Sequence, residues 1–298
     1  MRYSLVTSAG KGHINEDLVA VHERHGVVDI IVMDGATPLS PQRHVRAGAS
    51  DPSWFVQQFA ADLAAVLHRA GSQESLVAQA LVGTRAAYRA VAAATNVPPH
   101  DWPVATLSWV RVRRGRVQAE GMAPARLELY CLGDSKILLQ DGDGVRDLDP
   151  FDNPVEREVQ AAVAALVAEG VTDAAARWER LLPMLQARRH AQNTAAHPQV
   201  LCLAPRGPFA ARIHALDAPE QGQLLAMTDG FYRLVDTYGL YDDAALAAAA
   251  LERGLDALVD ELRAFEAGAV AAAGITAKRA DDASAVAWRF GSSREEAA

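Results

Sequence analysis

The stretch that most constrains the fold is a short run of branched apolar residues that ends in a carboxylate. Residues 27–33 are mainly Val, Ile and Met, and Asp34 and Gly35 follow them. The run lacks the alternation of a half-exposed strand, so it predicts a strand buried on both faces. Asp34 then lies at the edge of a core, where a buried carboxylate needs a partner such as a metal ion. A hairpin turn is the alternative, because Asp-Gly is also a common turn signal.

Composition indicates a folded protein with a large core. The chain has 298 residues, 50% of them hydrophobic and 22% charged, which suits one large domain or two ordinary ones. A net charge of −8 argues against a nucleic-acid or anionic-membrane partner. Cys131 and Cys202 lie in apolar runs and predict core residues, which favours a reducing, cytoplasmic setting. No opening stretch resembles a signal peptide, and no segment is apolar enough to span a membrane.

Groups of strands separated by helix pairs predict an α+β protein. The expected strands cover residues 2–8, 18–22, 105–112, 126–132, 136–140, 200–203, 212–216, 223–227 and 283–290. The expected helices cover residues 54–70, 73–94, a block at 154–193 with breaks at Gly170 and Pro183, 243–253 and 255–273. Ser72 and Ser75 provide capping chemistry for the second helix. Without repeats or a low-complexity linker, we expect one domain over residues 1–291 and a charged tail over 292–298.

Three local motifs resemble known sites but lack a required part. The segment 10–12 (Gly-Lys-Gly) has neither the Walker spacing nor its Ser/Thr. The segment 22–25 (His-Glu-Arg-His) lacks the i, i+4 histidine pair of a zinc protease and predicts a solvated turn. The segment 141–144 (Asp-Gly-Asp-Gly) lacks the flanking helices of a calcium loop and predicts a hairpin turn.

Five acidic sites stand at the ends or starts of apolar strands, each beside a glycine or a turn. They are Glu16-Asp17, Asp34, Asp134, Asp229 and Asp281-Asp282. A carboxylate set without His or Cys favours magnesium or manganese over zinc or copper. Two such ions bridged by one carboxylate can activate a water and neutralise a phosphoryl group.

The order of these sites resembles the type 2C, or PPM, family of metal-dependent protein serine/threonine phosphatases, in its bacterial form. The resemblance is carried by residues 15–17 (Asn-Glu-Asp), 32–35 (Val-Met-Asp-Gly), 132–136 (Leu-Gly-Asp-Ser-Lys), 227–231 (Met-Thr-Asp-Gly-Phe) and 281–284 (Asp-Asp-Ala-Ser). These pieces span almost the entire chain in the family's order. The resemblance implies a four-layer αββα sandwich of two packed antiparallel sheets flanked by helices.

The resemblance also implies two or three Mn²⁺ or Mg²⁺ ions held by named residues. Asp34 would bridge two ions, and the carbonyl of Gly35 would bind one of them. Asp229 and Asp281 would complete the other ion, with Asp282 as the alternative to Asp281. Asp34 and Asp229 are therefore the expected catalytic residues, and they act through a metal-activated water without a protein nucleophile.

Further positions of the family match outside this centre. Glu16 and Asp17 would contact the site largely through metal-bound waters, and Asp134 would hold a weaker third ion. The family's mobile flap lies between the Gly-Asp-Ser motif and the second Asp-Gly strand. Here that interval contains the helical block, which predicts an enlarged flap at about residues 150–198.

The sequence departs from the family at the phosphate. The family's phosphate-binding arginine falls four residues before Glu16, and Gly12 stands there. Ala36 replaces a histidine proposed as a general acid in animal members, and Lys136 replaces the usual arginine, which conserves charge but not fork geometry. The candidate residues for the phosphate or the leaving group are Lys11, His13, Arg43 and His44.

The resulting hypothesis is a hydrolase of phosphoserine or phosphothreonine in proteins, with a cognate serine/threonine kinase as a further partner. One alternative is a pseudophosphatase that keeps the fold for binding. Loss of the arginine favours it, whereas retention of carboxylates that repel one another without metal argues against it. The other alternative is a phosphatase of a small phosphorylated molecule, because the altered loop after Gly35 and the enlarged flap would reshape the cleft.

Overall fold

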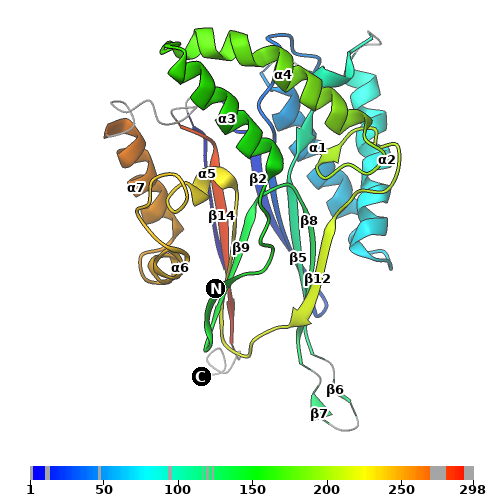
Figure 1. Cartoon of the computed structure of the whole chain (residues 1–298). Coiled ribbons are helices and arrows are strands. Elements are labelled where there is room, and N and C mark those ends of the chain that lie inside the picture. The colour runs from blue at the N-terminus through cyan, green and yellow to red at the C-terminus, as the bar shows by residue number, and fades with distance from the viewer. Residues whose placement is uncertain are drawn as a thin grey trace.

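Two five-stranded antiparallel sheets form the centre of the protein (Figure 1). The computed structural model describes residues 3–10, 14–45, 48–92, 96–115, 117–118, 121–122, 124–268 and 280–291. The first sheet contains, in spatial order, β1 (Tyr3–Ser8), β14 (Ala283–Phe290), β13 (Gly222–Met227), β9 (Lys136–Asp141) and β10 (Gly144–Asp147). The second contains β12 (Arg212–Asp217), β8 (Arg126–Leu132), β5 (Leu107–Arg113), β3 (Val27–Asp34) and β2 (Asp17–Arg24).

Short strands and helices complete the architecture. The short strands β4 (Val104–Ala105) and β11 (Leu201–Cys202) pair with each other, as do β6 (Val117–Gln118) and β7 (Gly121–Met122). The helices are α1 (Asp51–Val66), α2 (Gln73–Val91), the 3₁₀ turn η1 (Pro99–Asp101), α3 (Pro154–Ala168), α4 (Ala174–Thr194), α5 (Asp229–Tyr232), α6 (Asp243–Glu252) and α7 (Leu255–Gly268). Among the described residues, no helix is long and apolar enough to cross a membrane.

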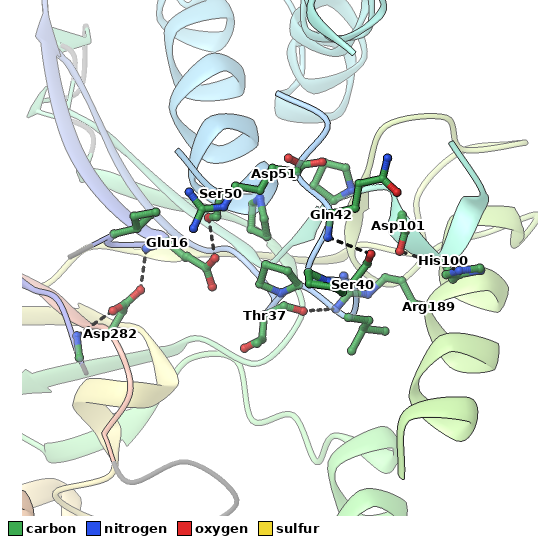
Figure 2. A pocket seen from close by; sticks show the side chains of 18 of the residues that line it. Glu16, Thr37, Ser40, Gln42, Ser50, Asp51, His100, Asp101, Arg189 and Asp282 are labelled. Atoms are coloured by element: carbon green, nitrogen blue, oxygen red, sulfur yellow. Dashed lines mark hydrogen bonds and ion pairs between the residues drawn. The ribbon is translucent and has the colours of Figure 1, made fainter. Parts of the chain in front are cut away.

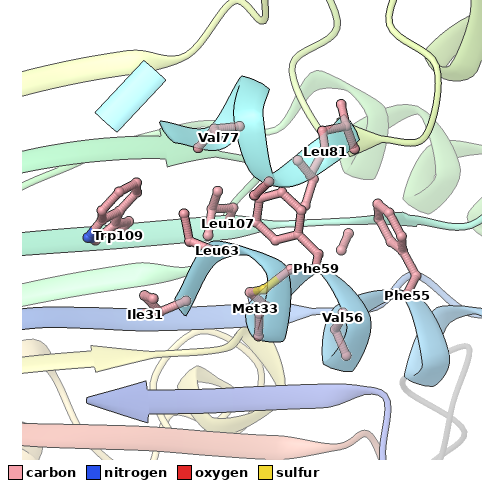
Figure 3. Packing of buried hydrophobic residues seen from close by; sticks show 14 of the residues in the cluster. Ile31, Met33, Phe55, Val56, Phe59, Leu63, Val77, Leu81, Leu107 and Trp109 are labelled. Carbon is pink, nitrogen blue, oxygen red and sulfur yellow. The ribbon is translucent and has the colours of Figure 1, made fainter. Parts of the chain in front are cut away.

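Three layers of apolar side chains hold the sheets and helices together. Helices α1 and α2 cover the outer face of the second sheet, where Phe59 and Leu63 pack near Met33 (Figure 3). Helices α5, α6 and α7 pack on the first sheet through a second cluster. The third cluster lies between the two sheets. This arrangement confirms the predicted αββα sandwich.

Strand β3 is buried on both faces, as its unbroken apolar run predicts. Ile31 and Met33 face the helices α1 and α2, whereas Ile30 and Val32 face the first sheet. All four side chains are 1% exposed or less. The end of β3 is therefore fixed by packing in two directions, and Asp34 is positioned with it.

Serine caps start the two helices beside the second sheet. The hydroxyl of Ser72 accepts a hydrogen bond from the N–H of Ser75 at the start of α2, as predicted. The hydroxyl of Ser50 does the same for Ser53 at the start of α1. Each cap satisfies a backbone donor that the helix leaves unpaired.

Helices α3 and α4 lie across one end of the sandwich (Figure 1). Gly170, with a φ of 85°, separates them as predicted. The predicted break at Pro183 is wrong, because α4 continues through it. A proline removes one hydrogen bond, and the buried side chains of Leu181 and Arg189 hold the helix on both sides. The predicted flap corresponds to this segment and stays a prediction.

Other local expectations meet with mixed outcomes. The predicted solvated turn at 22–25 is wrong for its first three residues, because β2 continues to Arg24, whose side chain pairs with the buried Asp29. The hairpin at 141–144 is confirmed by the pairing of β9 with β10, and Cys131 and Cys202 are buried as predicted. The last expected helix is confirmed over Leu255–Gly268. Its expected remainder at 269–273 lies outside the described residues, as do the charged tail and Lys11, Gly12 and His13.

Candidate metal centre and adjoining cavity

Four strands bring acidic residues together at one end of the sandwich. Asp17 opens β2 and Asp34 closes β3, and the two residues are register partners. Asp229 follows β13 at the start of α5, and residues 281–282 directly precede β14. The hydroxyl of Thr228 donates to Oδ2 of Asp17 at 2.9 Å and so connects the two sheets at this point. Residues distant in sequence thus form one cluster.

The ionised forms of the aspartates in this cluster are energetically costly. Burial raises the pKa of Asp34 well above its ordinary value, and the Asp229 and Asp17 carboxylates raise it further. Burial also raises the pKa of Asp17 to about 8, although hydrogen bonds from Thr228 and Ser284 oppose the shift. A buried carboxylate that is costly to ionise is stabilised by a nearby cation.

Two buried oxygens fit such a cation. Oδ1 of Asp17 and Oδ1 of Asp229 are buried and accept no hydrogen bond from the part of the chain that the structure describes. An all-carboxylate set suits magnesium or manganese. As the side chains stand, no three ligand-type groups among the described residues converge on a point where an ion would sit. Some carboxylates instead bond to protein groups and would have to turn to bind an ion.

The structure distinguishes Asp281 from Asp282. Both oxygens of Asp282 accept backbone hydrogen bonds, from Gly10 at 2.8 Å and from Glu16 at 2.6 Å (Figure 2). Asp281 instead pairs with Arg233 at 3.0 Å and contributes to the field on Asp34. Asp282 therefore fixes the loop before β2, which leaves Asp281 as the better candidate ligand.

Glu16 and Asp134 lie in different surroundings. Oε1 of Glu16 accepts a 2.6 Å hydrogen bond from the hydroxyl of Ser50, the residue that caps α1 (Figure 2). Asp134 accepts a 2.7 Å hydrogen bond from the side chain of Asn153, just before α3. Glu16 lines the cavity described below, and Asp134 is not among the residues that line it.

Close packing requires glycine at positions 35 and 230, directly after Asp34 and Asp229. A Cβ on Gly35 would lie 2.8 Å from Cβ of Pro52 and 2.9 Å from the carbonyl oxygen of Glu16. A Cβ on Gly230 would collide with the carbonyl oxygen of Asp282. Neither glycine has a positive φ, so close packing rather than backbone conformation is the reason for glycine there. Gly35 allows α1 to approach the end of β3.

A cavity of about 450 Å³ adjoins the acidic cluster. Glu16, Asp281 and Asp282 lie at its acidic side, and the loop 37–43 forms another wall. Arg189, His100 and Asp101 also line it (Figure 2). The cavity therefore connects the candidate metal ligands with a basic side chain.

Arg189 is a functional candidate that sequence reasoning missed. It lies on α4 and is 8% exposed, and its Nη2 donates to the carbonyl oxygen of Thr37 at 3.2 Å. Burial lowers the pKa of Arg189 to about 10, and Glu16 and Asp101 oppose the shift. The guanidinium thus stays positively charged at neutral pH. An arginine 155 residues after Asp34 in sequence gave no local signal of this placement.

Of the four predicted phosphate-binding candidates, the structure describes two. Lys11 and His13 lie outside the described residues. His44 is not among the residues that line the cavity, and its Nε2 lies 3.5 Å from Oδ2 of Asp101. Arg43 lines the cavity.

Comparisons with known proteins agree with this architecture. No protein-family model matches the sequence, and no curated protein sequence matches it either. Solved structures do match over nearly the whole chain, and serine/threonine phosphatases are among them. The fold is therefore that of the type 2C serine/threonine phosphatases.

Three of these structures illustrate the similarity. The S. agalactiae serine/threonine phosphatase is 16% identical, with 97% of this chain and 99% of that chain covered and a TM-score of 0.54. The Mycobacterium tuberculosis phosphatase PstP/Ppp is 17% identical, with 98% and 99% covered and a TM-score of 0.52. The catalytic domain of PstP in complex with two manganese ions is 18% identical, with 97% and 98% covered and a TM-score of 0.50.

Proposed function

We propose that the protein is a metal-dependent phosphomonoester hydrolase that dephosphorylates phosphoserine and phosphothreonine in proteins. The observation that carries this proposal is the clustering of Asp17, Asp34 and Asp229 from both sheets, with two buried carboxylate oxygens that have no hydrogen-bond partner among the described residues. The fold that surrounds this cluster is that of known serine/threonine phosphatases. The proposal treats residues 1–291 as one phosphatase domain.

The proposed cofactors are two or three Mn²⁺ or Mg²⁺ ions. Asp34 and the carbonyl of Gly35 would hold the bridged pair together with Asp229 and Asp281. Glu16 and Asp17 would contribute through bound waters, and Asp134 would hold a third ion. When bound, such ions lower the pKa of a water and neutralise the phosphoryl charge. A phosphatase of this fold, the catalytic domain of PstP, forms a complex with two manganese ions.

The protein groups position the reactants. Asp17 and Asp34 supply carboxylates in a buried setting, where burial and neighbouring carboxylates raise their pKa values and a bound cation would favour the ionised forms. Glu16 is held by Ser50, which orients its carboxylate toward the cavity side. The phosphorylated side chain would enter the cavity beside these residues, and no serine or cysteine nucleophile takes part.

The setting of the reaction follows from the substrate. A serine/threonine kinase would supply the phosphorylated protein. We place this kinase and the phosphatase in the cytoplasm. Two buried thiols, Cys131 and Cys202, suit a reducing compartment.

A small phosphorylated molecule is the second candidate substrate. The cavity volume of about 450 Å³ falls in the range of about 300–1,000 Å³ that is typical of small-molecule sites. A pseudophosphatase is disfavoured, because a protein that only binds partners has reason to lose carboxylates that repel one another.

The test is release of inorganic phosphate from a phosphothreonine peptide and from an aryl phosphate, with Mn²⁺ or Mg²⁺ and with a chelator. We expect turnover of the peptide that requires added metal and stops with the chelator, since oxygen ligands hold these ions reversibly. Turnover of the aryl phosphate and small phosphate esters alone would favour the second candidate. Full activity in metal-free protein, or no turnover of any phosphate ester with either metal, would contradict the proposal.

A further inference from the structure

The C-terminal half of α4 is fixed to the body of the protein. The side-chain amide of Asn193 donates to the carbonyl oxygens of Pro99 at 2.9 Å and of Trp102 at 3.1 Å. Asn193 is 1% exposed, so these bonds are shielded from water. These hydrogen bonds hold this part of α4 in place. Arg189 lies one turn before Asn193, on the same side of the helix.

Arg189 combines burial with unused hydrogen-bonding capacity. Its side chain is more than nine-tenths buried and lines the cavity. A guanidinium has five N–H donors, and the described residues supply one acceptor to it, the carbonyl oxygen of Thr37. Glu16 and Asp101 act on its charge, yet among the described residues neither forms an ion pair with it. A buried cation with spare donors facing a cavity suits an anionic ligand.

Arg189 also lies close to the candidate metal ligands. Its acceptor residue, Thr37, follows Asp34 by three positions, and the intervening Ala36 is tied by its N–H to the carbonyl oxygen of Val104 at 3.0 Å. The loop from Asp34 to Thr37 is therefore short and anchored. An anion in the cavity would lie between Arg189 and the acidic cluster.

We propose that Arg189 binds the phosphoryl group of the substrate, so that helix α4 supplies the arginine that the first motif lacks at Gly12. This inference rests on the proposed function. A planar guanidinium offers two parallel N–H donors to a phosphate, a geometry that lysine does not reproduce. Helices α3 and α4, which lie between β10 and β11, would then complete the phosphate site as well as cover it.

The experiment compares Arg189→Gln and Arg189→Lys with Arg180→Gln as the matched control. Arg180 lies on the same helix, is largely exposed and pairs with Glu169. The readouts are KM and kcat for an aryl phosphate, the inhibition constant of inorganic phosphate, and the melting temperature. For Arg189→Gln we expect KM and the inhibition constant to rise about tenfold to a hundredfold, the effect typical of a lost charged hydrogen bond. Arg189→Lys should recover part of the loss, and Arg180→Gln should behave as wild type.

A purely structural role for Arg189 would give a different pattern. Loss of its bond to Thr37 would lower the melting temperature and kcat without a selective change in phosphate inhibition. That pattern would overturn the inference, and so would wild-type phosphate inhibition in Arg189→Gln. An equal rise of the inhibition constant in Arg43→Gln would also overturn it. Calorimetric binding of inorganic phosphate in the presence of Mn²⁺ separates the two proposals. Arg189-dependent binding without turnover would contradict the proposed function alone, and turnover that is indifferent to Arg189 would contradict this inference alone.

Discussion

At the scale of single residues, Asp34 combines a backbone position fixed by packing with a carboxylate that is a candidate metal ligand. Its strand is buried on both faces, so the position of its backbone is fixed by packing. Burial and the neighbouring Asp229 and Asp17 make its ionised form costly. A bound metal ion would offset that cost, as the proposed function requires.

Asp34→Asn should therefore affect activity and stability in opposite directions. We expect turnover to fall more than about a hundredfold, since even outer-shell partners of a metal site contribute about 10–100-fold. In chelator at neutral pH, the melting temperature should rise, because the variant removes a carboxylate whose ionisation is opposed by burial and by Asp229 and Asp17. Phosphate release and thermal unfolding measure the two effects.

The control is Asp143→Asn, which removes an exposed carboxylate from the β9–β10 hairpin. It should leave both quantities near wild type. Equal loss of turnover in the two variants would mean that Asp34 is a structural aspartate like Asp143.

At the scale of elements, the start of α1 couples helix stability to the site. The Ser50 hydroxyl caps α1 through Ser53 and also donates to Glu16 at 2.6 Å. Pro52 of the same helix leaves room only for glycine at position 35. Helix α1 is thus both a cover for the second sheet and a support for the end of β3.

Ser50→Ala and Ser72→Ala form a matched pair that separates these roles. Each removes a serine N-cap with a 3.2 Å bond and should lower the free energy of unfolding by about 1 kcal/mol. Of the two serines, Ser50 is the one that bonds to Glu16, so Ser50→Ala and not Ser72→Ala should raise the Mn²⁺ concentration needed for half-maximal activity. Denaturant unfolding and a metal titration are the measurements. An equal metal requirement in both variants would refute the coupling.

Element-level patterns in the sequence predicted most of the fold. The unbroken apolar run before Asp34 predicted a doubly buried strand, and the hairpin at 141–144 and the cap at Ser72 followed from local chemistry. The break at Pro183 was mispredicted, because packing on both sides of the proline overrides its local propensity. The turn at 22–25 was mispredicted, because the partner of Arg24 is Asp29, a contact made across the hairpin.

At the scale of the whole molecule, Asp149 connects the two sheets through side-chain hydrogen bonds. It follows β10 of the first sheet and accepts hydrogen bonds from Arg212 and His214 on β12 of the second. Burial alone would raise the pKa of Asp149, but the hydrogen bonds from Arg212 and His214 outweigh burial and hold it below its ordinary value. Asp149 is 1% exposed, so its loss leaves Arg212 without its main partner.

Asp149→Asn should lower the free energy of unfolding by about 3 kcal/mol at neutral pH. Because the folded pKa is depressed, this stabilisation is present above the unfolded pKa of about 3.9 and is lost as pH falls through the folded value. The difference between wild type and variant should therefore shrink in acid. Asp217→Asn, an exposed change on β12, is the control. A difference that is constant from pH 7 to pH 3 would contradict this account.

The candidate site was predictable only in part from sequence. Each acidic site stood at the end or the start of a strand. The order of the motifs predicted that Asp17, Asp34 and Asp229 meet, and the hydrogen bond from Thr228 to Asp17 and the pKa shifts agree with this. Arg189 was not predictable, since its place in the cavity depends on how α4 crosses the end of the sandwich. Long-range packing of a helix leaves no short motif in the sequence.

The most direct test of the central claim is anomalous diffraction from crystals of the protein grown with Mn²⁺. The account predicts two manganese peaks about 3.5–4 Å apart, with the Asp34 carboxylate between them and Asp229 bound to one. Manganese absent from Asp34 and Asp229, or bound only elsewhere on the surface, would contradict it.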